Sequence, residues 1–274
     1  MSSKSINLII SLTRSGSNWL SYILGSSSDS AHLGEYHRPF SSHGHIACRL
    51  CEANGFSECK YLYGINNVDK SNAFKFAFDR FQVKSLIDCS KSKEWINYHI
   101  DNEINSQFRM SIIHLYRDFK AWFVSERRRN KTLTIDDSIS TWININREFS
   151  LLYSSHAHYI KVCYDDLSQW PNEEFPILFK KIGLEWNEDF LSYWNYEHHG
   201  LGGNGASFQN IGHLTKAKVT TGDDEYYSKH RHKVFYDERW KDELTVKEIK
   251  RISESDILME EYSNLGFRSF TAAH

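Results

Sequence analysis

The chain has 274 residues, of which 40% are hydrophobic, so it can bury a substantial core, and we expect one domain over 1–274. Its 33 Lys and Arg residues nearly balance its 35 Asp and Glu residues, which excludes a general nucleic-acid-binding surface, so any polyanionic ligand must be held by a local cluster. No run of eighteen apolar residues is present, so we expect no transmembrane segment.

A short apolar run near the N-terminus leads into a loop suited to an anion. Residues 6–10 predict a buried strand, and residues 21–24 continue after the loop as a helix. This turn aims the free N–H groups of the helix, with the positive end of its dipole, at the loop. Gly16 permits close backbone approach, and Arg14 adds a fixed charge. Further donors are Ser15, Ser17 and Asn18. The natural occupant is a phosphate group.

This loop is not a nucleoside-triphosphate loop. Gly16 has no partner glycine five residues upstream, and no Gly-Lys-Ser/Thr follows it, so an ordinary triphosphate kinase is disfavoured. A simple strand-turn-helix corner without a ligand remains the alternative.

The segments after the first helix hold polar side chains without a regular pattern. Residues 25–30 predict a loop, and residues 32–40 return toward the carboxyl edge of the sheet, where α/β proteins bind ligands. Glu35 and His37 in this second segment are therefore candidates for chemistry. Residues 41–70 predict a long insertion or lid.

Cysteines gather within that insertion. Cys48, Cys51 and Cys59 form a C-x2-C-x7-C cluster, with His43 and His45 just before it. Such a group can bind zinc when four donors adopt tetrahedral geometry. A second C-x-x-C pair is missing, so we favour reduced, partly buried thiols and no metal, with a metal left as the open alternative.

The remaining elements alternate between strands and helices. Residues 73–78 predict a strand, and residues 86–107 predict an interrupted helix. Further predicted elements are a strand over 111–116, a helix over 119–130, a helix from 134, a strand over 159–164, a helix over 171–181 ended by Gly183, and a terminal helix over 246–264. Six glycines predict a flexible loop over 196–230. This alternation predicts an α/β three-layer sandwich with a central, mainly parallel sheet.

The helix from residue 134 carries one apolar stripe, which we interpret as core. Its members recur at three- and four-residue spacing: Ile135, Ile139, Trp142, Ile145, Phe149 and Leu152.

The loop around Gly16 resembles the 5′-phosphosulfate-binding loop of sulfotransferases that use 3′-phosphoadenosine-5′-phosphosulfate (PAPS). In that family a strand is followed by Lys or Arg, Ser, Gly, two small hydroxyl residues and often Trp. Here those places are held by Arg14, Ser15, Gly16, Ser17, Asn18 and Trp19. The resemblance implies a P-loop NTPase-like sulfotransferase fold, with Arg14 as an electrostatic clamp on the leaving phosphate.

A second signature of the family is a strand that ends in Arg, followed eight residues later by a helical Ser. Arg117 and Ser125 have this separation, which implies that they hold the 3′-phosphate of the nucleotide. The alternatives are a salt bridge for Arg117 and a solvated helix position for Ser125.

A third stretch, residues 162–167, is similar to the family's Tyr-Glu-Asp-Leu. The resemblance implies that Tyr164 contacts the adenine and that Trp19 stacks on it. Weaker similarities occur at 199–204 and 237–240.

A hydroxyl acceptor must also lose a proton. Animal cytosolic members of the family use His, whereas several bacterial and Golgi-type members use Glu after the first helix. Glu35 is similar to the second type, with His37 in reserve. The alternative is that Glu35 only pairs with Arg38.

The resemblance implies an enzyme that transfers a sulfuryl group from PAPS to a hydroxyl acceptor, a carbohydrate or glycosylated metabolite, and releases adenosine 3′,5′-bisphosphate (PAP). A non-catalytic PAP-binding protein is the alternative, and a P-loop-like kinase is less favoured.

We expect a cytoplasmic location, because the first predicted strand leaves no room for a signal peptide and five cysteines do not suggest a secreted disulfide framework.

Overall fold

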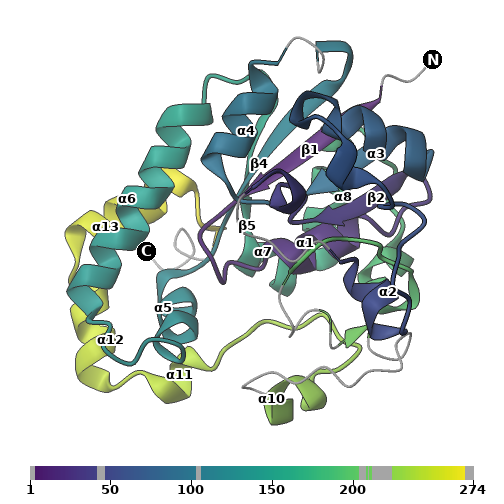
Figure 1. Ribbon diagram of the computed structural model, residues 1–274. Coiled ribbons are helices and arrows are strands. Elements are labelled where there is room, and N and C mark those ends of the chain that lie inside the picture. The colour runs from purple at the N-terminus through teal and green to yellow at the C-terminus, as the bar shows by residue number, and fades with distance from the viewer. Residues whose placement is uncertain are drawn as a thin grey trace.

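The computed structural model describes residues 4–41, 47–102, 106–203, 208, 210–211 and 224–268. Within these residues one sheet contains β1 (Ser5–Ile10), β2 (Ser30–Gly34), β3 (Ser85–Asp88), β4 (Arg109–Tyr116) and β5 (Tyr159–Cys163). All neighbouring strands pair in parallel, in the order β2-β3-β1-β4-β5 (Figure 1). The predicted α/β fold with a central parallel sheet is therefore confirmed.

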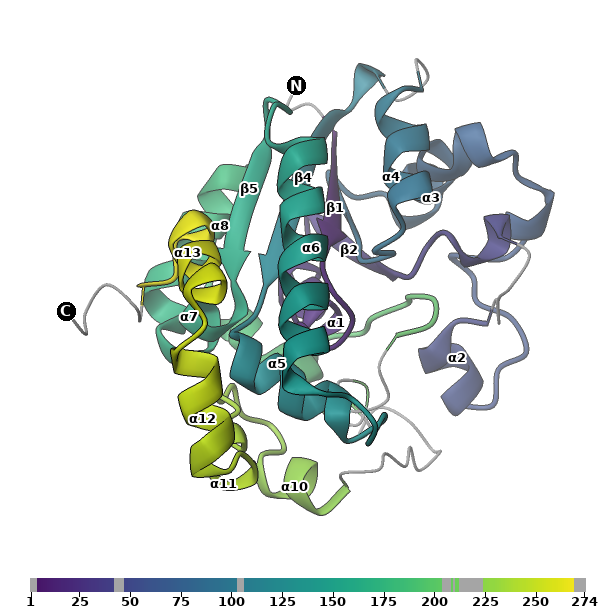
Figure 2. The same cartoon turned by 90° about the vertical axis from the view of Figure 1, so that its left-hand side faces the viewer.

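Helices cover both faces of the sheet and complete the three layers (Figures 1 and 2). On one face lie α4 (Lys93–Ile100), α6 (Ile135–Tyr153) and α13 (Asp256–Leu265). On the other face lie α1 (Ser17–Leu24) and α8 (Pro171–Ile182). The helix α3 (Ala73–Phe81) packs beside α4, where the Phe74 ring meets the rings of Trp95 and His99. Among the described residues, no helix is long and apolar enough to cross a membrane.

Shorter helices occupy the connections between these elements. The α-helices are α2 (Arg49–Ala53), α5 (Phe119–Arg127), α7 (Tyr164–Gln169), α10 (Asp224–Lys229), α11 (Trp240–Glu243) and α12 (Val246–Ser253). The 3-10 helices are η1 (Arg38–Phe40), η2 (Ile65–Asn67), η3 (Lys70–Asn72) and η5 (Glu188–Asn195). The predicted insertion at 41–70 thus contains α2 and η2, and the predicted loop at 196–230 contains α10. Gly205, Gly212 and Gly222 of that loop lie outside the described residues.

Local sequence signals explain the longer helices. The Thr134 side chain caps α6 by accepting the N–H of Asp137, and Trp142 is fully buried on its apolar face. Leu152 is 45% exposed, so the predicted apolar stripe does not extend to it. The helix α8 starts with Pro171 and ends at Gly183, whose φ of 77° suits glycine at a helix C-terminus.

The structure corrects three predicted elements. Residues 73–78 form helix α3 and not a strand, because Ala73 and Phe74 share a buried helical face with Ala77 and Phe78. The predicted helix over 86–107 begins as strand β3, whose four buried residues are too few to show a period. The predicted terminal helix is two helices, α12 and α13, since Ser255 lies between them in an extended conformation.

The order of the sheet places a ligand site at one edge. β1 lies between β3 and β4, so the chain crosses from one half of the sheet to the other at β1. In open α/β sheets, ligands bind beyond the carboxyl ends of the strands at such a point. The loops that follow β1, β2, β4 and β5 meet at this edge because all strands run in parallel.

Candidate functional site

The loop between β1 and α1 has a backbone conformation that suits close approach of a ligand. Gly16, just before α1, has a φ of 93°, and Arg14 has a φ of 66°. A positive φ is uncommon outside glycine, so the surrounding contacts must hold Arg14 in place. Trp122 Nε1 donates to the Thr13 carbonyl at 3.0 Å, and Thr13 Oγ1 donates to Glu126 at 2.6 Å. These bonds fasten the loop to α5.

The ring of Tyr164 lies directly on this loop. A Cβ added at Gly16 would lie 2.4 Å from Tyr164 Cδ2, so any larger residue would displace the ring. Trp19 meets Tyr164 edge-on, with ring centroids 5.1 Å apart. Tyr164 is the first residue of α7 and follows β5, whereas Trp19 belongs to α1. The two aromatic side chains assigned to adenine by resemblance thus lie together beside the loop.

Arg117 and Ser125 reach the same loop from β4 and α5. Arg14 Nε donates to Ser125 Oγ at 2.9 Å, and Arg117 Nη1 donates to the Arg14 carbonyl at 3.0 Å. The Arg117 guanidinium lies over the Tyr164 ring, 4.8 Å from its centroid. The segments assigned to two separate phosphates are therefore in direct contact.

Two buried polar atoms of this cluster have no hydrogen-bond partner among the described residues. They are Ser15 Oγ and Arg117 Nε. A buried donor left unsatisfied costs about 1–3 kcal/mol. The first N–H groups of α1 also lack partners within the helix. An anion at the loop would satisfy such donors.

A buried network fixes the end of β4. Asp165 Oδ2 accepts the backbone N–H of Asp118 at 2.6 Å, and Asp118 Oδ1 accepts that of Lys120 at 2.8 Å, which caps α5. Tyr262 of α13 donates to Asp118 Oδ2 at 3.2 Å. Burial, together with the negative charge of Asp118, raises the pKa of Asp165 above its ordinary value.

Asp237 belongs to the site, although the sequence marked it only by the weak similarity over 237–240. Its carboxylate pairs with Arg117 at 3.1 Å and with Arg239 at 2.8 Å. The side chains of Arg117 and Asp237 are only 7% and 9% exposed. Burial opposes the charge of Asp237, but Arg239 and Arg117 outweigh it and hold the pKa of this carboxyl below its ordinary value. Arg117 thus already holds a buried anion.

These side chains line a cavity of about 80 Å³. The lining includes most of the predicted donor site: Arg14, Gly16, Trp19, Arg117, Ser125 and Tyr164. Asp237 also lines it, together with residues that carried no recognisable motif: Tyr193, Asn210, Tyr227, Lys233 and Phe235. The predicted donors Ser15, in the turn, and Ser17 and Asn18, at the start of α1, are buried and do not line the cavity.

Glu35 follows β2 at the same edge of the sheet. Its carboxylate accepts from Arg38 Nε at 2.7 Å and from Lys91 Nζ at 3.0 Å. Burial opposes the charge, but Lys91 and Arg38 outweigh it and lower the pKa of Glu35 to about 2. The pairing with Arg38 that the sequence left as an alternative is therefore present, and it makes the carboxylate a weak base.

His37 lies half-buried two residues further on. Its backbone N–H donates to Ser90 Oγ at 3.1 Å, and its Nδ1 has no hydrogen-bond partner among the described residues. Burial lowers the pKa of His37 below its ordinary value, so the ring is neutral near pH 7. Glu35 and His37 both follow β2. Because β3 separates β2 from β1, β2 lies roughly 10 Å from β1.

Comparison with known proteins identifies the fold. No protein-family model and no curated protein matches the sequence. The sulfotransferase domain of the olefin synthase of Synechococcus PCC 7002 matches with a TM-score of 0.56 and 18% identity, over 97% of this chain and 96% of that one. The sulfotransferase domain from the curacin biosynthetic pathway matches with a TM-score of 0.54 and 15% identity, over 97% and 98%. The chain therefore has the fold of these sulfotransferase domains along nearly its whole length.

We expect Asp165→Asn to stabilise the protein more at pH 8 than at pH 4. A carboxyl with a raised folded-state pKa contributes stability below its unfolded pKa of about 4, and this contribution is lost as the pH rises toward the folded-state pKa. Asn keeps the oxygen that accepts from Asp118 but cannot ionise. Thermal unfolding of both proteins at the two pH values measures the difference, expected to be roughly 1–3 kcal/mol at pH 8. An equal difference at both pH values would contradict the raised pKa.

Proposed function

We propose that this protein is a PAPS-dependent sulfotransferase that transfers a sulfuryl group to the hydroxyl of a small molecule or glycan. One observation carries the proposal: Arg14, Arg117 and Tyr164, which follow three different strands, meet around the β1–α1 loop. The fold shared with sulfotransferase domains supports it.

The residues around the loop fit the chemical groups of the donor. Arg14 and the first N–H groups of α1 hold the phosphosulfate, and Arg117 with Ser125 holds the 3′-phosphate. Trp19 and Tyr164 contact the adenine. The unsatisfied donor on Arg117 is consistent with this assignment. Bound PAPS supplies the sulfuryl group and leaves as PAP.

Arg14 has the main electrostatic role in this proposal. Sulfuryl transfer is an in-line displacement that builds negative charge on the bridging oxygen of the leaving phosphate, as phosphoryl transfer does. Each preorganised donor near that oxygen lowers the barrier by about 2.7–4 kcal/mol. Because a guanidinium does not readily lose a proton, Arg14 acts as a clamp and not as an acid.

Donor binding requires a rearrangement of the cavity. Its volume of about 80 Å³ is well below the roughly 300–1,000 Å³ of typical ligand pockets. The pair between Arg117 and Asp237 is the contact most directly affected, because a 3′-phosphate competes with the carboxylate for the same guanidinium. We propose that Asp237 leaves Arg117 when the donor binds.

Glu35 is proposed as the base that accepts the proton of the acceptor hydroxyl, with His37 as the alternative. Glu35 is ionised throughout the physiological range, so it can always accept a hydrogen bond from the hydroxyl. Its low pKa limits the driving force for full proton transfer. His37 has the opposite property, because its neutral ring is the stronger base.

We propose that the acceptor binds near residues 41–70, which form an insertion or lid, and near residues 196–230. Both segments belong to one domain over 1–274. A carbohydrate or glycosylated metabolite is the acceptor class we propose. Since none of the five cysteines forms a disulfide, we propose that the protein works in the cytoplasm. A non-catalytic PAP-binding protein is the second candidate, because the cluster around Arg117 can bind PAP without using Glu35.

The decisive experiment is transfer of radiolabelled sulfur from PAPS to a panel of hydroxyl acceptors, with mono- and oligosaccharides at its centre. We expect a labelled product whose formation requires PAPS and is inhibited by PAP. Calorimetry with PAP and with ATP runs in parallel. Tight PAP binding without any labelled product would favour the non-catalytic candidate, and preferential ATP binding would favour the kinase.

Donor binding should respond in opposite directions to changes at the two ends of the buried ion pair. Arg117→Ala should weaken PAP binding about 100-fold, since it removes a charge-assisted bond to the 3′-phosphate. Asp237→Asn should tighten PAP binding about tenfold, because it removes the anion that competes for the guanidinium. Calorimetric Kd values for PAP test this, with thermal unfolding of the apo proteins as the control for folding. Weaker PAP binding by Asp237→Asn would contradict the proposed competition.

Turnover should separate Glu35 from His37. Glu35→Gln should lower kcat about 100-fold, because a general base usually contributes this much to the rate. The affinity for PAP should stay unchanged. With Glu35 as base, kcat should stay flat from pH 8 to pH 5, because its pKa of about 2 lies far below this range. A His37 base would instead lose activity as the pH falls through its lowered pKa, since only the neutral ring accepts a proton.

Lys91→Met provides the matched control for this measurement. It removes a partner of Glu35 without removing the carboxylate, so it should raise the pKa of Glu35. The acidic limb of the profile of kcat against pH should then move to higher pH, while turnover near pH 7 persists. If the ion pair were only structural, Lys91→Met would lose as much activity as Glu35→Gln.

A further inference from the structure

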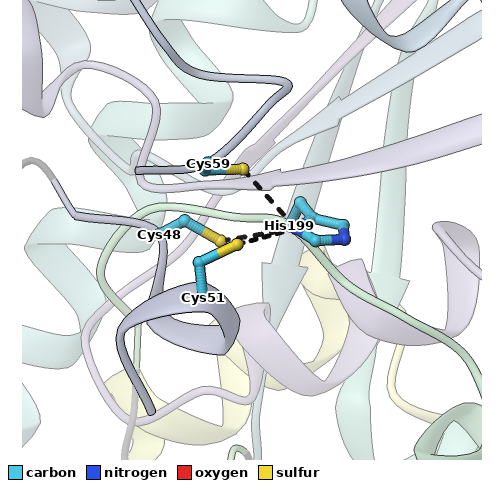
Figure 3. Close-up of side chains that lie close together, drawn as sticks. All are labelled: Cys48, Cys51, Cys59 and His199. Carbon is cyan, nitrogen blue, oxygen red and sulfur yellow. Dashed lines mark hydrogen bonds between the residues drawn. The ribbon is translucent and has the colours of Figure 1, made fainter. Parts of the chain in front are cut away.

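Four potential metal ligands from two distant segments converge beside β2. Cys48, Cys51 and Cys59 come from the insertion around α2, and His199 comes from the loop after η5 (Figure 3). Their ligand atoms all lie within 4.8 Å of one another. The sequence suggested only the three thiols, and it paired them with His43 and His45, which lie outside the described residues.

One nitrogen atom lies at a similar distance from all three sulfur atoms. His199 Nδ1 is 3.6 Å from the sulfur of Cys48, 3.5 Å from that of Cys51 and 3.5 Å from that of Cys59. An imidazole nitrogen has either one hydrogen or one lone pair, so it can serve one of the three thiols as a hydrogen-bond partner and not all of them. Hydrogen bonding therefore does not explain why all three gather there.

A tetrahedral zinc ion explains these separations. Zn–S bonds of about 2.3 Å and a Zn–N bond of about 2.0–2.1 Å place a ligating nitrogen roughly 3.6 Å from each sulfur when the angles are tetrahedral. The three observed separations, 3.6, 3.5 and 3.5 Å, agree with this value. The C-x2-C spacing of Cys48 and Cys51 is also the usual spacing of a zinc-binding pair.

The surroundings of His199 resemble those of a metal-binding histidine. Its second nitrogen, Nε2, lies 3.4 Å from the Glu197 carboxylate, an arrangement that leaves the Nδ1 lone pair for a metal. Its side chain is 13% exposed, and Cys48 and Cys59 are buried. Four protein ligands in a partly buried position leave no coordination place for a substrate, which is typical of structural zinc.

We propose that Cys48, Cys51, Cys59 and His199 bind a structural Zn²⁺ ion. Binding releases the protons of the three thiols, and no change of oxidation state is involved. This assignment replaces the interpretation of the cluster as simple reduced thiols. Since it concerns metal content and stability, it does not depend on the proposed sulfuryl transfer.

The metal would fasten a segment that forms one wall of the candidate site. Leu201 bridges to Gly34 at the end of β2 and also to Cys48. The Glu35 N–H donates to the Leu201 carbonyl at 2.8 Å. A Cβ at Gly202 would lie 2.8 Å from the Glu35 carboxylate, so the segment packs directly against the proposed base. Zinc is thus placed to hold the backbone on which Glu35 rests.

The first test is metal analysis of the untagged protein, purified without chelators. We expect about one zinc per chain, the content of a closed four-ligand site. Cys59→Ala and His199→Ala should each lose most of this zinc. Cys163→Ala is the matched cysteine control and the double variant His43→Ala/His45→Ala is the histidine control, and both should keep it. Zinc loss in the histidine control with retention in His199→Ala would overturn the ligand set.

A second measurement does not depend on variants that fold. Replacement of zinc by Co²⁺ in the unmodified chain should give the intense visible absorption of tetrahedral cobalt with thiolate charge-transfer bands. Removal of the metal by a strong chelator should lower the midpoint of thermal unfolding by about 5–10 °C. Absence of both metal uptake and a chelator-dependent shift would overturn the proposal, whatever the outcome of the sulfuryl-transfer assay.

Discussion

The contact between the Tyr164 ring and Gly16 sets the geometry around the β1–α1 loop. Because the ring occupies the space of a Cβ, it fixes the end of β5 against the loop that follows β1. β4 lies between these two strands in the sheet, so the side chain at its end is enclosed from both sides. Arg117 accordingly lies over the Tyr164 ring and donates to the Arg14 carbonyl. A larger residue at position 16 would open the whole arrangement.

Enclosure of Arg117 has an electrostatic consequence. A buried guanidinium is stable only when a counter-charge and hydrogen bonds accompany it. Asp237 supplies that charge, and Arg239 together with Arg117 holds the pKa of its carboxyl low. In the proposed donor complex, a phosphate at Arg117 would therefore replace one buried anion by another, and its affinity would reflect the difference between the two.

Sequence reasoning predicted structure correctly where the signal lies within one local segment, while the role of the loop in binding a phosphosulfate stays a prediction. The loop from Arg14 to Trp19 and the helix α8 have signals that need no knowledge of the rest of the chain. The strand predicted over 73–78 was wrong, because alternating Phe and Ala residues fit either period and only packing against the sheet decides. Asp237 lies 120 residues from Arg117, and His199 lies 140 from Cys59. No local pattern encodes such pairs, since the fold alone brings them together.

The two halves of the site thus depend on different kinds of contact. Parallel strand ends position the residues around the β1–α1 loop, whereas Glu35 follows β2, which is the edge strand of the sheet in the described part of the chain. The Leu201 segment is held beside it by bonds to Leu33 and Glu35. A lone segment at a sheet edge has few partners to order it. Fastening its other side to Cys48 and the neighbouring thiols supplies the missing constraint, so the position of the proposed base rests on the cysteine cluster as much as on the sheet.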